Sequence, residues 1–174
     1  NGNLFWLFDL RYKKAGKTLS FEFLVDDYAI DQLSPPKLAF YISMINTFKD
    51  GFIGMNYTRI NRWVGNYFSP DKRMINNNVL LGSQIGPDAH SIGLIYFIEY
   101  DNNTFISNEL TFIERGGGTI YDWPDNIGAS QNFGYSSEQF PSNPIKSNFN
   151  YNLELNKFLI LNKNKIAINL KINI

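Results

Sequence analysis

Strict alternation of apolar and polar residues is the feature that most constrains this chain. It is clearest in Ile166–Ile174, where Ile or Leu occupies every second position and Ala, Asn or Lys the positions between. Successive side chains of a β-strand point to opposite faces of a sheet, so this period of two predicts a strand with one apolar face. Seven earlier segments show related patterns, and the chain is predicted to be all-β. The eight predicted strands are Leu4–Tyr12, Thr18–Asp26, Lys37–Ile45, Phe52–Asn61, His90–Tyr100, Thr104–Glu114, Phe149–Leu161 and Ile166–Ile174.

The predicted connections alternate between short turns and longer segments. Two of them, Arg62–Ala89 and Arg115–Asn148, exceed the roughly 12–15 residues beyond which a loop in a compact protein is usually functional or disordered. Both contain aromatic residues that can pack, so we expect order, at least in the first loop. Such alternation is expected of an up-and-down meander with one plain end and one elaborated end.

Composition excludes several classes of function. The chain has 174 residues, enough for one domain with a sizeable core, and its net charge is +0. A neutral chain lacks the basic footprint that nucleic-acid binding requires. The absence of cysteine excludes thiol catalysis, zinc–thiolate sites and disulfides, and Asp26, Asp27 and Asp31 lack the spacing of a calcium loop. We therefore predict a single domain, residues 1–174, without a metal or a cofactor.

Alternation alone leaves two interpretations of the apolar face open. A soluble β-domain buries this face, whereas an outer-membrane barrel exposes it to lipid. No apolar run approaches the roughly 18 residues of a transmembrane helix, but a barrel strand needs only about 9–11. Charges on the polar faces (Glu109), aromatic residues near strand ends (Trp6, Tyr100) and the alternating loop lengths favour the membrane. We expect an antiparallel up-and-down transmembrane β-barrel segment, with about eight strands and two long loops.

Four stretches carry a resemblance to a known family: FEFLVDDYAID (Phe21–Asp31), PPKLAFYISM (Pro35–Met44), NYTRINRWV (Asn56–Val64) and LLGSQIGPDAHSIGL (Leu80–Leu94). The glycines and the Gly-Pro-Asp block of the last stretch are the most specific. Over Leu4–Glu114 the chain resembles the capsule assembly Wzi family of Gram-negative outer-membrane proteins. The resemblance implies an outer-membrane barrel of more than eight strands that holds capsular polysaccharide at the cell surface without catalysis.

The resemblance also sets expectations about completeness, location and partners. The chain starts in a strand pattern without an initiator Met, so we expect it to be the C-terminal part of a larger barrel. It ends in Ile174, where outer-membrane barrels usually end in an aromatic residue. Expected partners are capsular or exported polysaccharide, outer-membrane lipid and other outer-membrane or periplasmic assembly proteins. A periplasmic C-terminus would place both long loops at the periplasmic side, although long loops usually face outside.

A polysaccharide site needs aromatic faces that stack on sugar rings, together with amides, carboxylates and Arg that bond hydroxyls and uronic acids. The first long loop and its flanking strands offer such groups. The candidate polysaccharide-binding residues are Arg59, Asn61, Arg62, Trp63, Asp88 and His90. In the alternative, both arginines pair with carboxylates in the lumen and Trp63 only packs. His90, the single histidine, is more easily explained as structural than as catalytic.

Other functions remain open at this point. One is a porin-like channel, which needs a charged, open lumen. Another is a soluble all-β module that binds glycan, or that hydrolyses it with Asp122 and Asp125 on either side of Trp123. The triple glycine Gly116–Gly118 lacks the G-K-[ST] of a phosphate loop and is interpreted as a flexible strand exit. No nucleophile-elbow or H-E-x-x-H motif is present, so the chain is predicted not to be an enzyme.

Overall fold

The computed structural model describes residues 5–26, 37–65, 75–76, 79–80, 85–101, 103–119, 139–161 and 164–174. Every element of regular secondary structure assigned in these ranges is a β-strand. None of the described segments forms a helix long and apolar enough to cross a membrane. The strands are β1 (Phe5–Lys14), β2 (Lys17–Asp26), β3 (Leu38–Phe48), β4 (Gly51–Ile60), β5 (Ile75–Asn76), β6 (Val79–Leu80), β7 (Ala89–Asp101), β8 (Thr104–Arg115), β9 (Lys146–Leu161) and β10 (Asn164–Asn173).

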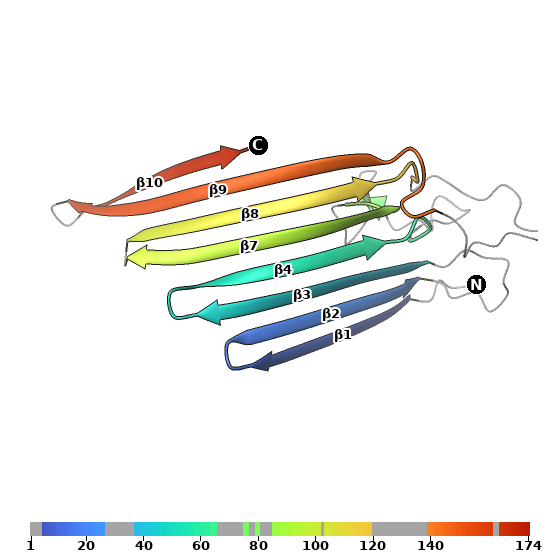
Figure 1. The fold of residues 1–174 in the computed structure, drawn as a ribbon, viewed down its shortest axis with the longest axis horizontal. Helices are drawn as coiled ribbons and strands as arrows, with labels where there is room; N and C mark the ends of the chain where they lie inside the picture. The colour runs from blue at the N-terminus through green and yellow to red at the C-terminus, as the bar shows by residue number, and fades with distance from the viewer. Residues whose placement is uncertain are drawn as a thin grey trace, which may run out of the picture.

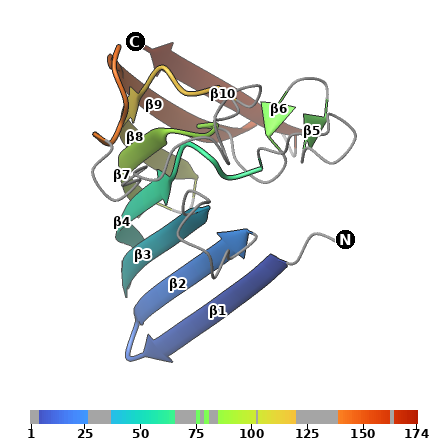
Figure 2. The same cartoon turned by 90° about the vertical axis from the view of Figure 1, so that its right-hand side faces the viewer.

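Eight of the strands form one antiparallel up-and-down sheet in the order β1-β2-β3-β4-β7-β8-β9-β10 (Figure 1). This confirms the predicted all-β class, strand number and meander. The sheet is open, because β1 and β10 are its two edges and do not pair with each other. Closure into a barrel therefore stays a prediction. The short strands β5 and β6, which were not predicted, pair only with each other, and Figure 2 shows them on the side toward which the large sheet curves.

The observed strands are longer than predicted at several polar ends. β3 continues to Phe48 because its pair with Gly51 closes the hairpin to β4. β9 begins at Lys146, which pairs with Arg115 at the end of β8. Backbone pairing needs no apolar side chain, so such ends leave little trace in the periodicity.

The two ends of the sheet differ. The four hairpin turns of the large sheet lie at one end, which we call the short-turn end, and its longer connections lie at the other, the long-loop end (Figure 1). The turn between β1 and β2 is two residues, Ala15 and Gly16, with φ values of 47° and 76°. Two positive φ angles define the turn type whose twist matches that of a hairpin. The predicted plain end and elaborated end are thus observed.

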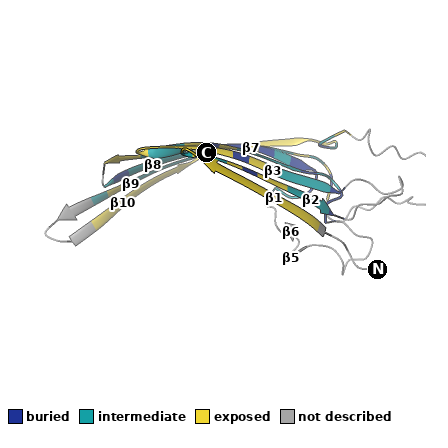
Figure 3. Ribbon diagram, turned by 90° about the horizontal axis from the view of Figure 1, so that it is seen from below, coloured by how far each residue is buried: buried dark blue, intermediate teal, exposed yellow. Residues whose placement is uncertain are grey.

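The sheet is arched (Figure 3), and its two faces differ in polarity. Directly paired residues of an antiparallel sheet share a face, so the register assigns every described strand residue to one side. One face carries the alternating apolar series, and most of its side chains are exposed, such as Leu10 at 64% and Leu170 at 51%. The other face is polar and surrounds a hollow. The polar face is therefore concave and the apolar face convex.

A small apolar cluster lies on the concave side at the long-loop end. Ile60 and Val64 are buried there, and Leu24, Ala39 and Ile85 pack against them. The segment that follows β4 thus turns inward over the concave face. The Gly65 N–H donates to the buried Asp26 carboxylate (2.7 Å), which fixes this inward turn to the end of β2.

Candidate functional site

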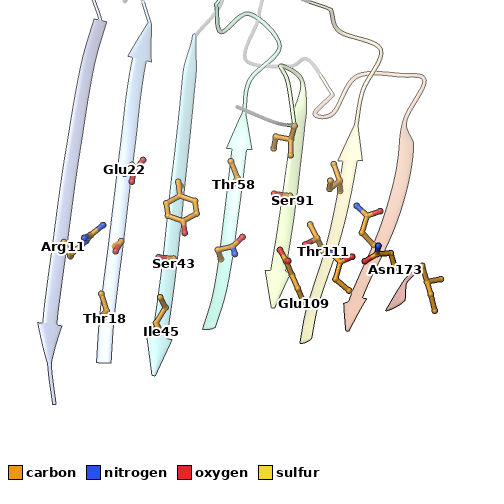
Figure 4. A pocket seen from close by; sticks show the side chains of 18 residues that line it. Arg11, Thr18, Glu22, Ser43, Ile45, Thr58, Ser91, Glu109, Thr111 and Asn173 are labelled. Carbon is orange, nitrogen blue, oxygen red and sulfur yellow. The ribbon is translucent and has the colours of Figure 1, made fainter. Parts of the chain in front are cut away.

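The hollow on the concave face has a volume of about 1030 Å³ and extends from β1 to β10 (Figure 4). Among the described residues that line it, three have charged side chains: Arg11, Glu22 and Glu109. Most of the other lining groups are hydroxyls and amides. They belong to Thr18, Ser20, Tyr41, Ser43, Asn56, Thr58, Ser91, Thr111, Asn150, Asn152 and Asn173. Such groups both donate and accept hydrogen bonds, so the hollow suits water or a ligand rich in hydroxyls.

Toward the short-turn end the concave face becomes aromatic. Phe52 on β4 stacks on Phe97 on β7, with 5.4 Å between ring centroids. Phe105 on β8 follows at 6.1 Å from Phe97, and Phe158 on β9 lies edge-on to Phe105 at 5.9 Å. Contacts of this kind stabilise by about 0.5–1.5 kcal/mol per pair beyond burial. The four rings form an aromatic patch on the concave face, outside the set of residues that lines the hollow.

A buried carboxylate ties the two long connections together at the long-loop end. Asp88, 1% exposed and with φ of 56°, immediately precedes β7. Its Oδ2 accepts from the Gly118 N–H (2.9 Å) and from the Ser142 hydroxyl, and its Oδ1 accepts from the Ser142 N–H (3.0 Å). The Gly116 N–H donates to the Asp88 carbonyl (2.7 Å). Asp88 thus fixes both ends of the connection between β8 and β9 to the start of β7.

The triple glycine is explained by this contact. A Cβ on Gly116 would lie 2.6 Å from the Ser142 nitrogen, and one on Gly118 would lie 2.7 Å from the Asp88 Cβ. The prediction of a strand exit is correct, because β8 ends at Arg115. The glycines also permit the close approach of three backbone segments.

Gly116→Ala is expected to loosen this contact. The added methyl group would overlap backbone and carboxylate atoms that cannot all retreat, so we expect a loss of about 1–3 kcal/mol in local stability. Faster cleavage by trypsin at Lys146, followed by mass spectrometry, would report it. Gly86→Ala provides a comparison, because its Cβ would meet nothing within 4 Å and only its φ of 74° opposes the change. Cleavage of Gly116→Ala no faster than that of the wild-type protein would contradict the expected overlap.

A second cluster lies on the convex face at the same end. Arg59 on β4 and His90 on β7 are directly paired. The Arg59 guanidinium carbon is 3.8 Å from the centroid of the Phe140 ring, and the Phe140 and His90 rings are 5.8 Å apart. His90 Nε2 lies 2.8 Å from Glu114 on β8, whose other carboxylate oxygen accepts from the Ser147 hydroxyl (3.3 Å). We call Arg59, His90, Glu114 and Phe140 the rim cluster.

The six predicted binding residues all lie near the ends of β4 and β7, but they divide into two groups. The first group consists of Arg59, His90 and Asn61. Arg59 and His90 are members of the rim cluster, and Asn61 lies beside it because its Oδ1 accepts from Arg59 Nε (3.2 Å). Trp63 and Asp88 are buried. Asp88 uses its carboxylate within the fold, and Trp63 lies under Arg62, whose guanidinium carbon is 4.9 Å from the Trp63 ring centroid. Contact of these residues with polysaccharide stays a prediction.

Three contributors were missed from the sequence: Glu114, Phe140 and Ser142. The alternation placed Glu114 only at a strand end, and nothing local connects the other two to β4 or β7. Asp122 and Asp125 lie outside the described residues. In the described ranges, no group of three or more His, Asp or Glu residues is arranged to hold a metal ion.

Comparisons of the chain with protein-family models, with curated proteins and with solved structures find no match. The fold and site define an open, arched, all-β meander with a polar hollow. The Wzi resemblance stays a prediction.

Proposed function

We propose that this sheet forms part of the wall of an outer-membrane β-barrel, with its convex face in lipid and its concave face toward the lumen. The polarity of the curved sheet carries the proposal. A soluble curved sheet closes around its apolar side chains, whereas a membrane barrel has an apolar exterior and a polar interior. Here the apolar face is convex and exposed and the polar face is concave.

The distribution of polar residues on the convex face supports this proposal. They lie at the two margins of an apolar band. At the long-loop end the margin consists of Arg59, His90, Glu114 and Ser147, and at the short-turn end of Lys14, Lys17, Asn46 and Lys157. Asn108 lies within the band, and it accepts a hydrogen bond from the Tyr151 hydroxyl (3.0 Å). Polar groups in hydrocarbon require such partners.

The band also crosses the hydrogen-bonded rows obliquely. Residues that are paired from strand to strand form a row across the sheet. The row that starts at Tyr12, the last apolar residue of β1, reaches β10 at Ile174. The apolar band on β10 continues beyond this row, toward the short-turn end, as far as Ile166. At the long-loop margin the band starts at Trp6 on β1. On β9 it starts at Phe149, and the row that contains Phe149 crosses β1 four residues beyond Trp6. This drift of about one residue per strand inclines the band by roughly 25–35° to the rows. Barrel strands tilt by about 35–45°, so the band would lie nearly level in a membrane.

For the role of this barrel we propose attachment or assembly of capsular polysaccharide at the cell surface, without catalysis. The Wzi resemblance supports this role, and so does the chemistry of the hollow. Its amides and hydroxyls would bond sugar hydroxyls, and its few charges leave room for neutral as well as acidic repeats.

Membrane extracts of the native host test both parts of the proposal. An antibody to this chain should detect a band in the outer-membrane fraction that changes mobility on boiling. With Asn150→Leu and Asn152→Leu combined, which removes two amides from the hollow, we expect capsule in the medium and an unchanged mobility shift. A soluble band without a shift would overturn the membrane assignment. Capsule fully retained by the double variant would overturn the polysaccharide role.

A further inference from the structure

The rim cluster lies on the face that the proposed function assigns to lipid, not on the face that surrounds the hollow. One row of paired residues contains Arg59, His90 and Glu114. The next row on the same face, toward the short-turn end, contains Tyr57, Ile92 and Phe112. That second row belongs to the apolar band. A ligand of the rim cluster would therefore contact polar and apolar surface at once.

Arg59 supplies a positive charge at this position. Its contacts within the described part of the chain are to Asn61 and to the Phe140 ring, neither of which carries a negative charge. Phe140 and the Asn61 oxygen hold the side chain in place, so less conformational freedom remains to be lost when the guanidinium binds an anion. Phosphate and carboxylate are the anions that an arginine binds best.

The other groups of the cluster fit a sugar better than a bare anion. Glu114 would repel an isolated phosphate, but its carboxylate accepts hydrogen bonds from hydroxyls. His90 Nδ1 is buried and has no hydrogen-bond partner among the described residues. Flat faces are present as well. The ring centroids of Phe40 and Tyr57 are 5.6 Å apart. The ring centroids of Tyr57 and His90 are 5.9 Å apart, and His90 in turn contacts Phe140.

We propose that the rim cluster binds the headgroup of an anionic glycolipid. Arg59 pairs with its phosphate or carboxylate, Phe140 and Tyr57 contact its sugar, and its acyl chains lie along the convex apolar face. This inference rests on the proposed function, because it requires that face to be in a membrane.

Native mass spectrometry of the full-length protein in detergent would test the inference, with lipid A as the probe and phosphatidylglycerol and phosphatidylcholine for comparison. The wild-type protein should prefer lipid A to both phospholipids. Arg59→Gln should weaken lipid A binding about tenfold or more, the usual effect of losing a charged hydrogen bond. Phe140→Leu should reduce the preference for lipid A over phosphatidylglycerol. Arg115→Gln, next to Glu114 but on the concave face, should change nothing.

Each other outcome overturns the inference in a recognisable way. Equal losses in Arg59→Gln and Arg115→Gln would indicate general surface charge. Equal binding of lipid A and phosphatidylglycerol by the wild-type protein would indicate an anion site without sugar recognition. A mobility shift on boiling, measured for every variant, separates these results from failure of the proposed function. A shifting, membrane-embedded protein that does not select lipid A refutes the glycolipid site alone.

Discussion

Leu94→Arg is expected to destabilise the sheet in a bilayer by about 2–4 kcal/mol, the cost of an arginine near the middle of a barrel's lipid-facing surface. Leu94 lies within the apolar band on β7 and is 45% exposed. In a water-soluble protein the same substitution at such an exposed position would change stability by only about 0.5 kcal/mol. Urea titration of folding into phospholipid vesicles, followed by tryptophan fluorescence, would measure the difference.

Thr111→Arg is the matched control. Thr111 lies on the neighbouring strand β8 and faces the hollow, so an arginine there should remain hydrated and cost little. The prediction depends on the contrast between the two faces. A large cost at Thr111 together with a negligible cost at Leu94 would reverse the assignment of lipid and water.

Asp88→Ala should release the connection between β8 and β9. It would leave the Gly118 N–H, the Ser142 N–H and the Ser142 hydroxyl without their acceptor. Loss of a buried carboxylate that holds several donors costs about 3 kcal/mol or more, and alanine tolerates the positive φ poorly. The measurement is the rate of proteolytic cleavage between Gly116 and Lys146. Asp88→Asn keeps the shape and tolerates the φ, so it should have an intermediate effect.

Asp101→Ala controls for the loss of any carboxylate that accepts from the backbone. Asp101, the last residue of β7, accepts from the Asn103 N–H (2.8 Å), but it is exposed at the short-turn end. Its removal should leave the connection between β8 and β9 as resistant as in the wild-type protein. If Asp88→Ala were cleaved no faster than Asp101→Ala, the proposed role of Asp88 in fixing that connection would be wrong.

The parts of the fold that were predictable are those that local alternation encodes. Ile166–Ile174 shows its strand and its two faces directly, and the short turns between strands fixed the order of the sheet. Alternation does not indicate which face is concave, because curvature depends on all eight strands together. It also does not predict the contact between Asp88 and Ser142, which are 54 positions apart. The Gly-Pro-Asp block contains Asp88, but the partner of its carboxylate comes from a loop whose sequence has no period.

The oblique course of the apolar band has a consequence for strand register. If β4 slipped by two residues against β3, every side chain would keep its face, and the alternation would be fully respected. With the sheet in a membrane as proposed, the slip would nevertheless carry Arg59 into hydrocarbon or push apolar residues out of it. The pairs that close the hairpins are displaced from the rows in the same direction as the band. These pairs are Lys14 with Lys17, Phe48 with Gly51, and Leu161 with Asn164. Depth in the bilayer would thus select, among all registers that alternation allows, the one in which the turns end at a common level.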